Sequence, residues 1–333
     1  MQFGGGYNWN ITGPSYGTGA FENLELSQGF IGKKWSLGIS DGVSYTPQAP
    51  TLGFTGIPGI GEPVATPSPN PPVVNPPILT LNTYSLGNSA SASFNRRLNY
   101  AWSANMSGNY DLLIFPDGNG LDTDTTGANG GLSYRLSARD SLIGNYQFSK
   151  FTYPDYLFSF YTHSVFFGFT RQWSRRLSTD ISAGPQWTSS SNSMLVPSST
   201  GAAVNASVNY LYGFNKLSAN YQRGVSAGGG YLIGSQTDSA GISYLRKFGN
   251  TSTLGFDFGY SRFSGLINNG VTNAKYGGAQ ATHQLGRNFQ VFANYSAIAQ
   301  STSSQLPVNT LGTVIQIVGF GIGYSPRERG STR

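Results

Sequence analysis

The sequence contains no cysteine, and only 10% of its 333 residues are charged. Soluble globular domains carry about 25% charged residues, so this chain is poorly equipped to face water on every side. It also lacks any run of roughly 20 apolar residues, which a membrane-spanning helix requires. The absence of cysteine is compatible with an envelope location. Composition thus disfavours both an ordinary soluble domain and a bundle of membrane helices.

Aromatic residues and glycine are abundant, whereas charged residues are few. Aromatic residues make up 14% of the chain and there are 45 glycines, whereas apolar residues in total reach only 38%. The chain therefore has apolar surface to cover but no element that is apolar all round. A β-barrel with one apolar face and one polar face satisfies both conditions.

The beginning of the chain carries no export signal. Residues 2–6 contain neither the basic stretch nor the apolar stretch of a secretory signal peptide. We expect an export signal to have been removed, and the sequence is equally compatible with the removal of an upstream domain.

A short turn motif recurs along the chain. It consists of an apolar residue, a small polar residue, one or two basic residues and a second apolar residue. Clear copies lie at 31–35, 94–98 and 173–177, and looser copies at 136–140, 214–217, 248–251 and 285–289. From the second copy on, the spacing is about 34–42 residues, which fits two strands, one tight turn and one longer loop.

The segments between these turns alternate with a period of two. Leu254, Phe256, Phe258 and Tyr260, for example, alternate with Gly255, Asp257, Gly259 and Ser261. A large soluble β-sandwich would alternate as well, but its solvent face would carry lysine and glutamate. Small neutral residues favour a wet, confined lumen. Seven tight turns predict fourteen strands, and segments 2–10 and 313–325 add two. We therefore predict an all-β, antiparallel up-and-down transmembrane barrel of about 16 strands, with both termini on one side.

Charge is predicted to be polarised along the barrel. The tight turns are basic: Lys33, Lys34, Arg96, Arg97, Arg135, Arg139, Arg171, Arg175, Arg176, Lys216, Arg246, Lys247 and Arg287. The acids are predicted in the opposite, longer loops: Glu62, Asp111, Asp117, Asp122, Asp124 and Asp155. A basic rim suits anionic lipid headgroups on the periplasmic side. Because the basic residues form a ring of turns rather than a groove, no nucleic-acid partner is expected.

Aromatic residues flank the same turns and are predicted to form the periplasmic aromatic girdle. They are Trp35, Phe94, Tyr134, Trp173, Tyr212 and Phe248.

The last predicted strand, residues 316–324, alternates apolar or aromatic residues with glycine and ends at Tyr324. It resembles the C-terminal assembly signal of bacterial outer-membrane β-barrel proteins of the porin-like kind, although a tail follows Tyr324. The resemblance covers nearly the whole chain. It implies a place in the outer membrane of a Gram-negative bacterium, insertion by the outer-membrane assembly machinery, and a passive channel for small hydrophilic solutes or sugars. The barrel would span residues 1–325, and 326–333 would be a short periplasmic tail.

Two long loops suggest further roles. Residues 46–77 hold ten of the 17 prolines, which predicts an extended extracellular loop, either loose at the surface or folded into the lumen as a constriction. The alternating oxygen donors Asp117, Asn119, Asp122 and Asp124 suit calcium, but the flanking helices and closing glutamate of a calcium-binding EF-hand are absent. A solvated acidic loop is the alternative, and no other cofactor is expected.

An aromatic group at another predicted outer loop has two interpretations. It consists of Phe151, Tyr153, Tyr156, Phe158, Phe160 and Tyr161. We assign it to the outer girdle and loop packing, with a sugar-stacking surface as the alternative. The two histidines, His163 and His283, are too few and too isolated to suggest a hydrolase, so no enzymatic activity is predicted.

The predicted function is passive passage of small hydrophilic solutes. The alternatives are a conduit for polysaccharide export, or a plugged barrel that serves as an anchor or adhesin, and a homo-oligomer is compatible with each. Counting from the apolar face places Glu25, Asp180 and Asp257 in the lumen, with Arg135 near the periplasmic mouth. These pore-lining residues predict a weak preference for cations.

Overall fold

The computed structural model describes residues 1–12, 18–47, 84–118, 120–192, 196–228, 232–267, 270–303 and 314–325. Sixteen strands account for most of them, together with one 3-10 turn, η1 (Pro154–Tyr156). The strands are β1 (Gln2–Asn10), β2 (Gly19–Ile31), β3 (Trp35–Pro47), β4 (Tyr84–Arg97), β5 (Trp102–Ile114), β6 (Thr123–Arg135), β7 (Asp140–Tyr153), β8 (Phe158–Gln172), β9 (Leu177–Ser190), β10 (Ser199–Tyr212), β11 (Asn215–Ser226), β12 (Ser235–Phe248), β13 (Ser252–Gly265), β14 (Val271–Leu285), β15 (Phe289–Thr302) and β16 (Ile315–Tyr324).

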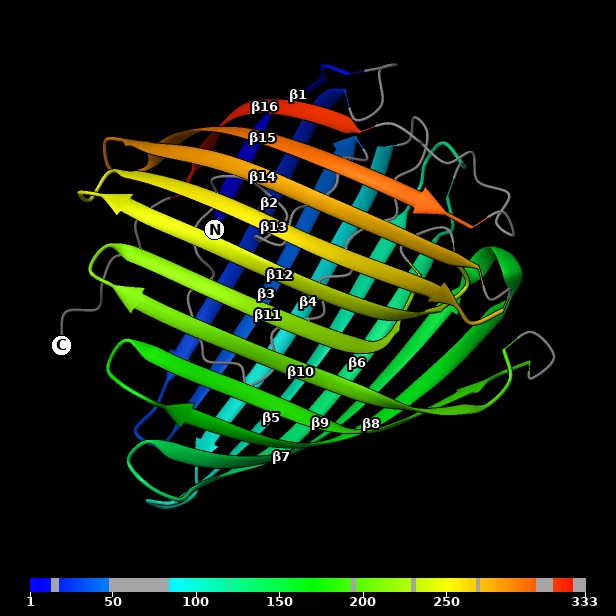
Figure 1. Ribbon diagram of the computed structural model, residues 1–333, viewed down its shortest axis with the longest axis vertical. Helices are drawn as coiled ribbons and strands as arrows, with labels where there is room; N and C mark the ends of the chain where they lie inside the picture. Colours follow the sequence, from blue (N-terminus) through cyan, green and yellow to red (C-terminus); the bar gives the residue numbers. More distant parts are fainter. Residues whose placement is uncertain are drawn as a thin grey trace.

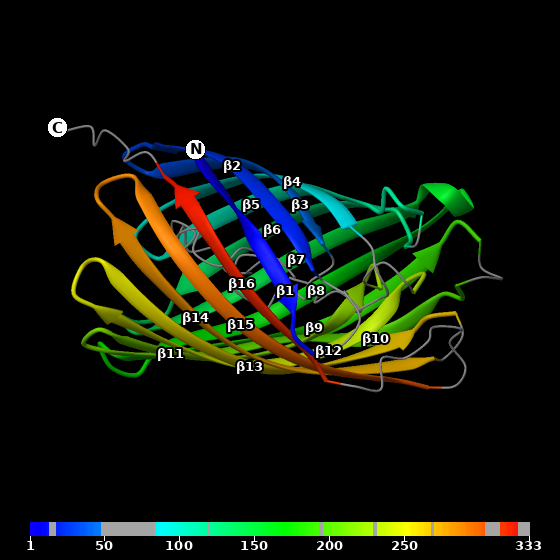
Figure 2. The same cartoon turned by 90° about the horizontal axis from the view of Figure 1, so that it is seen from above.

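The strands form one closed barrel (Figures 1 and 2). Each strand is antiparallel to its neighbours along the chain, and β1 pairs with β16 from Phe3 opposite Tyr324 to Asn10 opposite Ile317. Closure removes the unpaired sheet edges that a membrane would not tolerate. The fold class and the number of strands predicted from the sequence are confirmed. None of the helical segments in the described ranges is long and apolar enough to cross a membrane.

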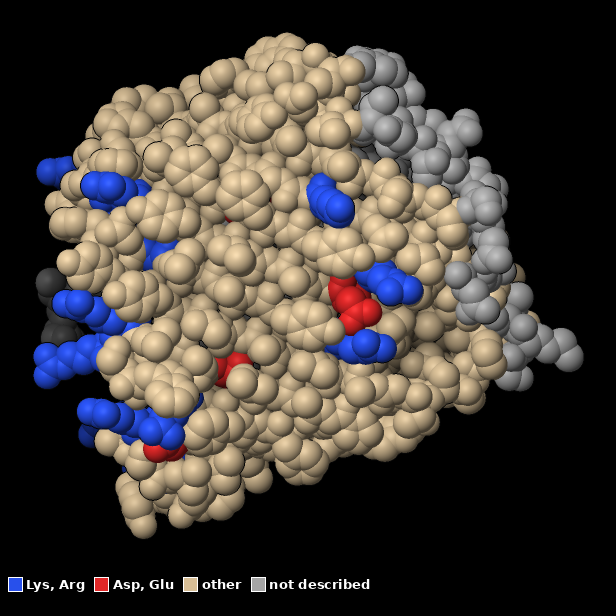
Figure 3. All heavy atoms as spheres, in the orientation of Figure 1, with Lys and Arg blue, Asp and Glu red and all other residues tan. Residues whose placement is uncertain are grey.

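The two ends of the barrel differ as predicted. Seven connections of two to four residues join β2 to β3 and every second strand pair after it, and β1 begins and β16 ends at this same end. Lys and Arg gather at this end in the space-filling view (Figure 3). Guanidinium groups also stack on the flanking aromatic rings, with Arg171 over Trp173 at 4.4 Å and Arg176 over Tyr212 at 4.8 Å from the ring centroid. We call this end the periplasmic end.

Period-two alternation sorts the side chains between lipid and lumen. On β13, Phe256 and Phe258 are 37% and 63% exposed on the outer face, whereas Asp257 between them is 7% exposed. Directly opposed residues share a face, so the register carries this assignment from strand to strand around the barrel.

Two inner glycines allow the first and last strands to meet. A Cβ atom at Gly6 would lie 2.1 Å from the carbonyl oxygen of Phe320, and one at Gly321 would lie 2.2 Å from the ring of Phe292. The buried rings of Phe21 and Phe292 contact each other over these glycines, with centroids 6.0 Å apart. Glycine at these positions therefore lets aromatic side chains cover the seam from inside.

Some sequence predictions about the loops need correction or fall outside the described residues. Asp111 and Asp124 were predicted in long loops, but they lie in β5 and β6, because these strands extend further from the periplasmic end than their apolar patterns indicate. Most of the proline-rich loop 46–77 and the tail 326–333 lie outside the described residues.

Candidate functional site: the barrel lumen

The inner wall is polar but nearly uncharged. Successive inward positions on β3 and β4 are mainly serine and glycine, and those on β5 and β6 are mainly asparagine, serine and glycine. The side chains hydrogen-bond along the wall, as with Ser40 and Ser91, whose hydroxyl oxygens are 2.8 Å apart. Short neutral side chains leave room for water and hold small hydrophilic solutes only weakly.

The three predicted acids lie on inward positions. Asp257 sits opposite Ser243 and Gly278, and one of its carboxylate oxygens is buried with no hydrogen-bond partner among the described residues. Asp180 accepts a hydrogen bond from the Thr170 hydroxyl at 3.0 Å. Glu25 is partly exposed and faces the same side as Gln2 and Gly42. The three carboxylates come from different parts of the wall rather than forming one site.

Arg135 lies at the periplasmic rim. It is the last residue of β6, and its Nε donates a hydrogen bond to the Ser137 carbonyl oxygen at 3.0 Å. The side chain is thus tied to its own turn, which keeps its charge at the mouth rather than within the lumen.

The sequence analysis missed Asp111 as an inward acid. Its carboxylate accepts hydrogen bonds from Ser89 and Asn109, and the inward side chains of Ser89, Ser91 and Asn109 around it are exposed. The inner wall of β4 and β5 is therefore open to solvent. Extending the alternation of Met106 and Tyr110 by one residue would have placed Asp111 on the lumen side.

A buried aromatic cluster lies at the opposite, outer mouth. We call Phe151, Tyr153, Phe158, Phe160 and Val196 the mouth cluster, and each is at most 4% exposed. Residues from three loops pack against it, among them Leu121, Ala227, Ile233 and Leu266, and Val196 itself lies between β9 and β10. The cluster therefore joins inward-facing wall residues of β7 and β8 to loops that follow β5, β9, β11 and β13.

Tyr153 links the mouth cluster to the loop between β11 and β12. Its hydroxyl donates to the Ala227 carbonyl oxygen at 2.7 Å and accepts from the Gly234 amide at 2.8 Å. The loop-packing part of the assignment is confirmed for Phe151, Tyr153, Phe158 and Phe160, but the outer-girdle part is wrong for them, because these rings point into the barrel. Tyr161, on the opposite face of β8, contacts Phe148 and Lys150 outside.

The outer half of the lumen is covered on one side. Inward polar residues near the outer ends of β8, β9 and β11 to β15 are all less than 9% exposed: Thr162, Ser164, Gln186, Thr188, Ser226, Ser235, Thr237, Ser261, Thr272, Ser296 and Gln300. The hydroxyl groups of Ser226, Ser235 and Thr237 hydrogen-bond to one another, with oxygen–oxygen distances of 2.7 to 3.1 Å. Among the described residues, the solvent-accessible part of the inner wall is therefore that of β4 and β5, opposite the covered wall.

The predicted calcium residues are spread over different elements. Asp117 is in an exposed turn, Asp124 belongs to β6, and Asn119 lies outside the described residues. Asp122 accepts a hydrogen bond from the Phe115 amide at 2.8 Å, which closes the loop between β5 and β6. Within the described ranges, no three His, Asp or Glu side chains come together in a way that could hold a metal ion.

Both histidines lie on the outer face of the barrel. The Nδ1 atom of His163 is 2.7 Å from the Tyr146 hydroxyl, and that of His283 is 2.7 Å from the Ser252 hydroxyl. The side chains therefore face away from the lumen and from any solute in it.

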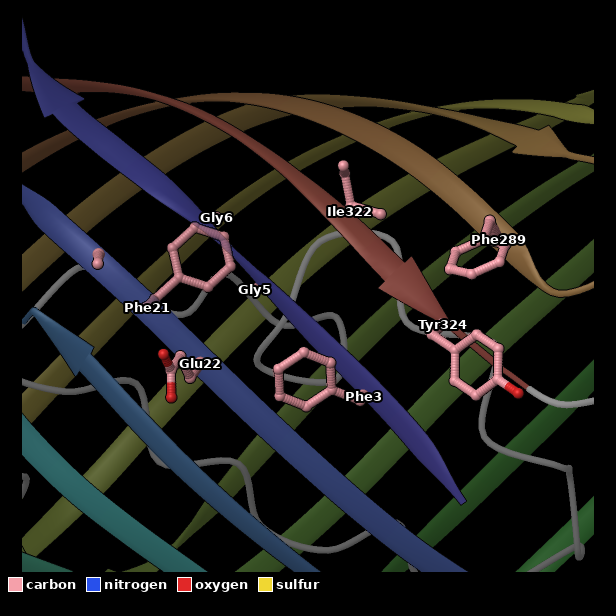
Figure 4. A pocket seen from close by; sticks show the side chains of 9 residues that line it. Phe3, Gly5, Gly6, Phe21, Glu22, Phe289, Ile322 and Tyr324 are labelled. Carbon is pink, nitrogen blue, oxygen red and sulfur yellow. The ribbon is translucent and has the colours of Figure 1, made fainter.

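A groove at the strand seam also belongs to the outer face (Figure 4). It lies over Gly5, where a side chain is missing, and Phe3, Ile322 and Tyr324 form its walls. Phe3 and Ile322 are 45% and 58% exposed on the lipid-facing surface. The groove is thus a hollow in the apolar belt and separate from the lumen.

No family model matches the chain, and neither does any curated protein sequence. Among solved structures, it is similar to OccK5 (OpdH) of Pseudomonas aeruginosa, with 11% identity over 97% of this chain and 96% of that one and a TM-score of 0.49. The CymD monoaromatic hydrocarbon channel gives 11% identity, coverage of 98% and 88%, and a TM-score of 0.46. Acinetobacter baumannii OccAB2 gives 9% identity over 97% of this chain and 96% of that one, with a TM-score of 0.45. By its own strand pairing and two-faced pattern, the chain has the architecture of bacterial outer-membrane β-barrels.

Proposed function

We propose that the protein is a channel of the bacterial outer membrane for the passive passage of small hydrophilic solutes. The observation that carries this proposal is the closed barrel of sixteen strands, with an apolar outer face and a neutral polar wall. A barrel of this strand number is wide enough for an aqueous channel. The described inward side chains are mostly short, neutral and polar, which suits the passage of small hydrophilic solutes.

The mouth cluster favours small solutes over a polymer. Because it holds loops against the inner wall at the outer end, a polysaccharide would have to displace buried aromatic contacts, whereas a small solute can pass beside β4 and β5. A fully plugged anchor or adhesin is opposed by the exposed inward side chains of Ser89, Ser91 and Asn109.

Conductance of the purified protein in a planar bilayer tests the proposal. We expect stepwise openings whose conductance rises with salt concentration and falls when small neutral sugars are added as blockers. Insertion without conductance would instead support the plugged anchor.

The inward acids are expected to give a weak cation preference. The interaction energy between a unit charge and a monovalent ion 4 Å away in water is about 1 kcal/mol, which corresponds to roughly a fivefold change in local ion concentration. Asp111→Asn should therefore reduce the ratio of potassium to chloride permeability more than Asp180→Asn together with Asp257→Asn, because Asp257 is covered and Asp111 faces the accessible path. Reversal potentials in a potassium chloride gradient measure this ratio. Anion selectivity of the wild-type channel would contradict the assignment.

Calcium binding stays a prediction for Asp117, Asn119, Asp122 and Asp124. If these residues bind calcium, a chelator should lower the melting temperature, and Asp122→Asn should abolish the difference between chelated and calcium-loaded protein. Thr123→Ala is the control, since it leaves every carboxylate in place. Identical melting curves with and without chelator would rule out a stabilising calcium site.

Outer-membrane lipids, the assembly machinery and further copies of the chain are the proposed partners. Self-association is supported by a row of small outward residues, in which Ala92, Gly108 and Ala128 are directly opposed on β4, β5 and β6. Beside it, Asp41 is exposed within the apolar belt and accepts a hydrogen bond from Asn88 at 2.9 Å. Small residues permit close approach in membranes, and ionisable groups there are usually covered by protein.

A further inference from the structure

A group of charged side chains interrupts the apolar belt on one side of the barrel. Arg223 in β11, Asp238 in β12, Arg262 in β13 and Lys275 in β14 all lie on the outer face. Arg262 shares this face with Phe258 and Tyr260 of the same strand, which are 63% and 39% exposed. We call these four residues the outer basic cluster.

The strand register brings the four residues together. Arg223 is directly opposite Asp238, Asp238 is directly opposite Arg262, and Lys275 is opposite Tyr260, two positions from Arg262. The space-filling view shows acidic atoms between basic ones on the tan outer surface, away from the basic periplasmic end (Figure 3). Four consecutive strands thus contribute to one continuous surface.

Only part of this charge is neutralised. A guanidinium nitrogen of Arg223 is 3.4 Å from the Asp238 carboxylate, which also accepts a hydrogen bond from the Tyr221 hydroxyl at 2.9 Å. Across the described ranges, no carboxylate lies within 4.0 Å of Arg262 or Lys275. Three positive charges and one negative charge leave a net charge of +2 on the cluster.

The cluster lies near the outer ends of its strands. Arg262 is three residues before the end of β13 at Gly265, and Lys275 is four residues after the start of β14 at Val271. An outer-membrane orientation with the tight turns in the periplasm places these residues at the outer-leaflet headgroups. A cation on the lipid face is costly at the bilayer midplane and much less so near the interface.

We propose that the outer basic cluster binds the phosphate group of an anionic glycolipid in the outer leaflet. Arg262 and Lys275 supply the free positive charges, Asp238 positions Arg223 beside them, and the Tyr260 ring lies against the lipid. Guanidinium groups bind phosphate oxygens in a bidentate fork, and lysine binds them as a point charge. This inference rests on the outer-membrane placement of the proposed function, but not on conduction.

A membrane lipid is the occupant that the location favours. The cluster faces sideways, on the lipid-exposed surface beside Phe258, rather than toward the lumen. A second copy docked symmetrically at the same surface would bring two patches of net charge +2 together, which is repulsive. Free phosphate carries the same chemistry but lacks the acyl chains that would hold it against the apolar belt.

The test measures lipid binding to the full chain in detergent. Native mass spectrometry would compare diphosphorylated lipid A with its dephosphorylated form, with inorganic phosphate as a competitor. We expect selective binding of the phosphorylated lipid and little competition by inorganic phosphate. Binding should be about a hundredfold weaker, or more, in Arg262→Gln combined with Lys275→Gln, since each lost hydrogen bond to a charged group costs roughly tenfold or more in affinity.

Matched variants separate this site from general charge effects. Lys150→Gln removes an outward lysine that lies over Tyr161 on another side of the barrel, and it should bind lipid like the wild type. Lys275→Arg keeps the charge and should retain binding even if the double variant folds poorly. Equal affinity for the dephosphorylated lipid, or equal loss in Lys150→Gln, would overturn the proposal. Bilayer conductance is expected to be unchanged in every variant, so failure here is distinguishable from failure of the channel proposal.

Discussion

Replacing Phe256 with arginine is expected to lower the free energy of unfolding in lipid by about 2–4 kcal/mol. Phe256 lies in the outward row of β13 between Leu254 and Phe258, within the apolar belt. Arginine there would expose a guanidinium group to hydrocarbon, and the nearest aqueous phase on that face is at the membrane surface. Reversible urea unfolding in lipid vesicles, followed by tryptophan fluorescence, measures the change.

Gln280→Arg is the matched control for this prediction. Gln280 lies in β14 on the inward face, opposite Gly255, so it sits at nearly the same level as Phe256. The same arginine would then extend into the aqueous lumen, and stability should change little. Equal destabilisation of the two variants would show that the face assignment of β13 and β14 is wrong.

Phe160→Ala is expected to enlarge the conducting path at the outer mouth. Phe160 is fully buried, stacks on Phe151 with centroids 4.7 Å apart, and supports the loops that pack on the mouth cluster. Removing a buried phenylalanine ring costs about 3–5 kcal/mol of packing. Since 1.4 kcal/mol is a factor of ten, the population with loops released from the wall should rise by about a hundredfold or more.

Single-channel recordings would show this release as a larger mean conductance and a higher size limit for sugars that enter the pore. Tyr161→Ala is the control, because Tyr161 follows Phe160 in β8 but points outward onto Phe148 and Lys150. The control should conduct like the wild type. Unchanged conductance in Phe160→Ala would mean that the mouth cluster does not limit the path.

The inner and outer faces could be predicted from residue order because the two faces of a strand meet different solvents. In β13, a single alternation places Phe258 toward lipid and Asp257 inside, and each strand repeats the same rule. Strand ends were less certain, as Asp111 shows. Polar residues near the membrane surface are common in strands and in loops alike. The alternation of apolar and polar residues therefore no longer marks the strand where β5 leaves the apolar belt.

The sequence by itself determined the barrel, its sixteen strands, the basic periplasmic end and the face of each strand, because these depend on local turns and on a period of two. Only the tertiary structure decided which distant residues meet. The Tyr153 hydroxyl hydrogen-bonds to Ala227 and Gly234 across the outer mouth. One outer surface likewise brings together four charged residues from four strands: Arg223, Asp238, Arg262 and Lys275. Alternation assigns a residue to a face but not to a height or a neighbour. Those depend on the stagger of one strand against the next and on loop packing, which arise only when all sixteen strands close.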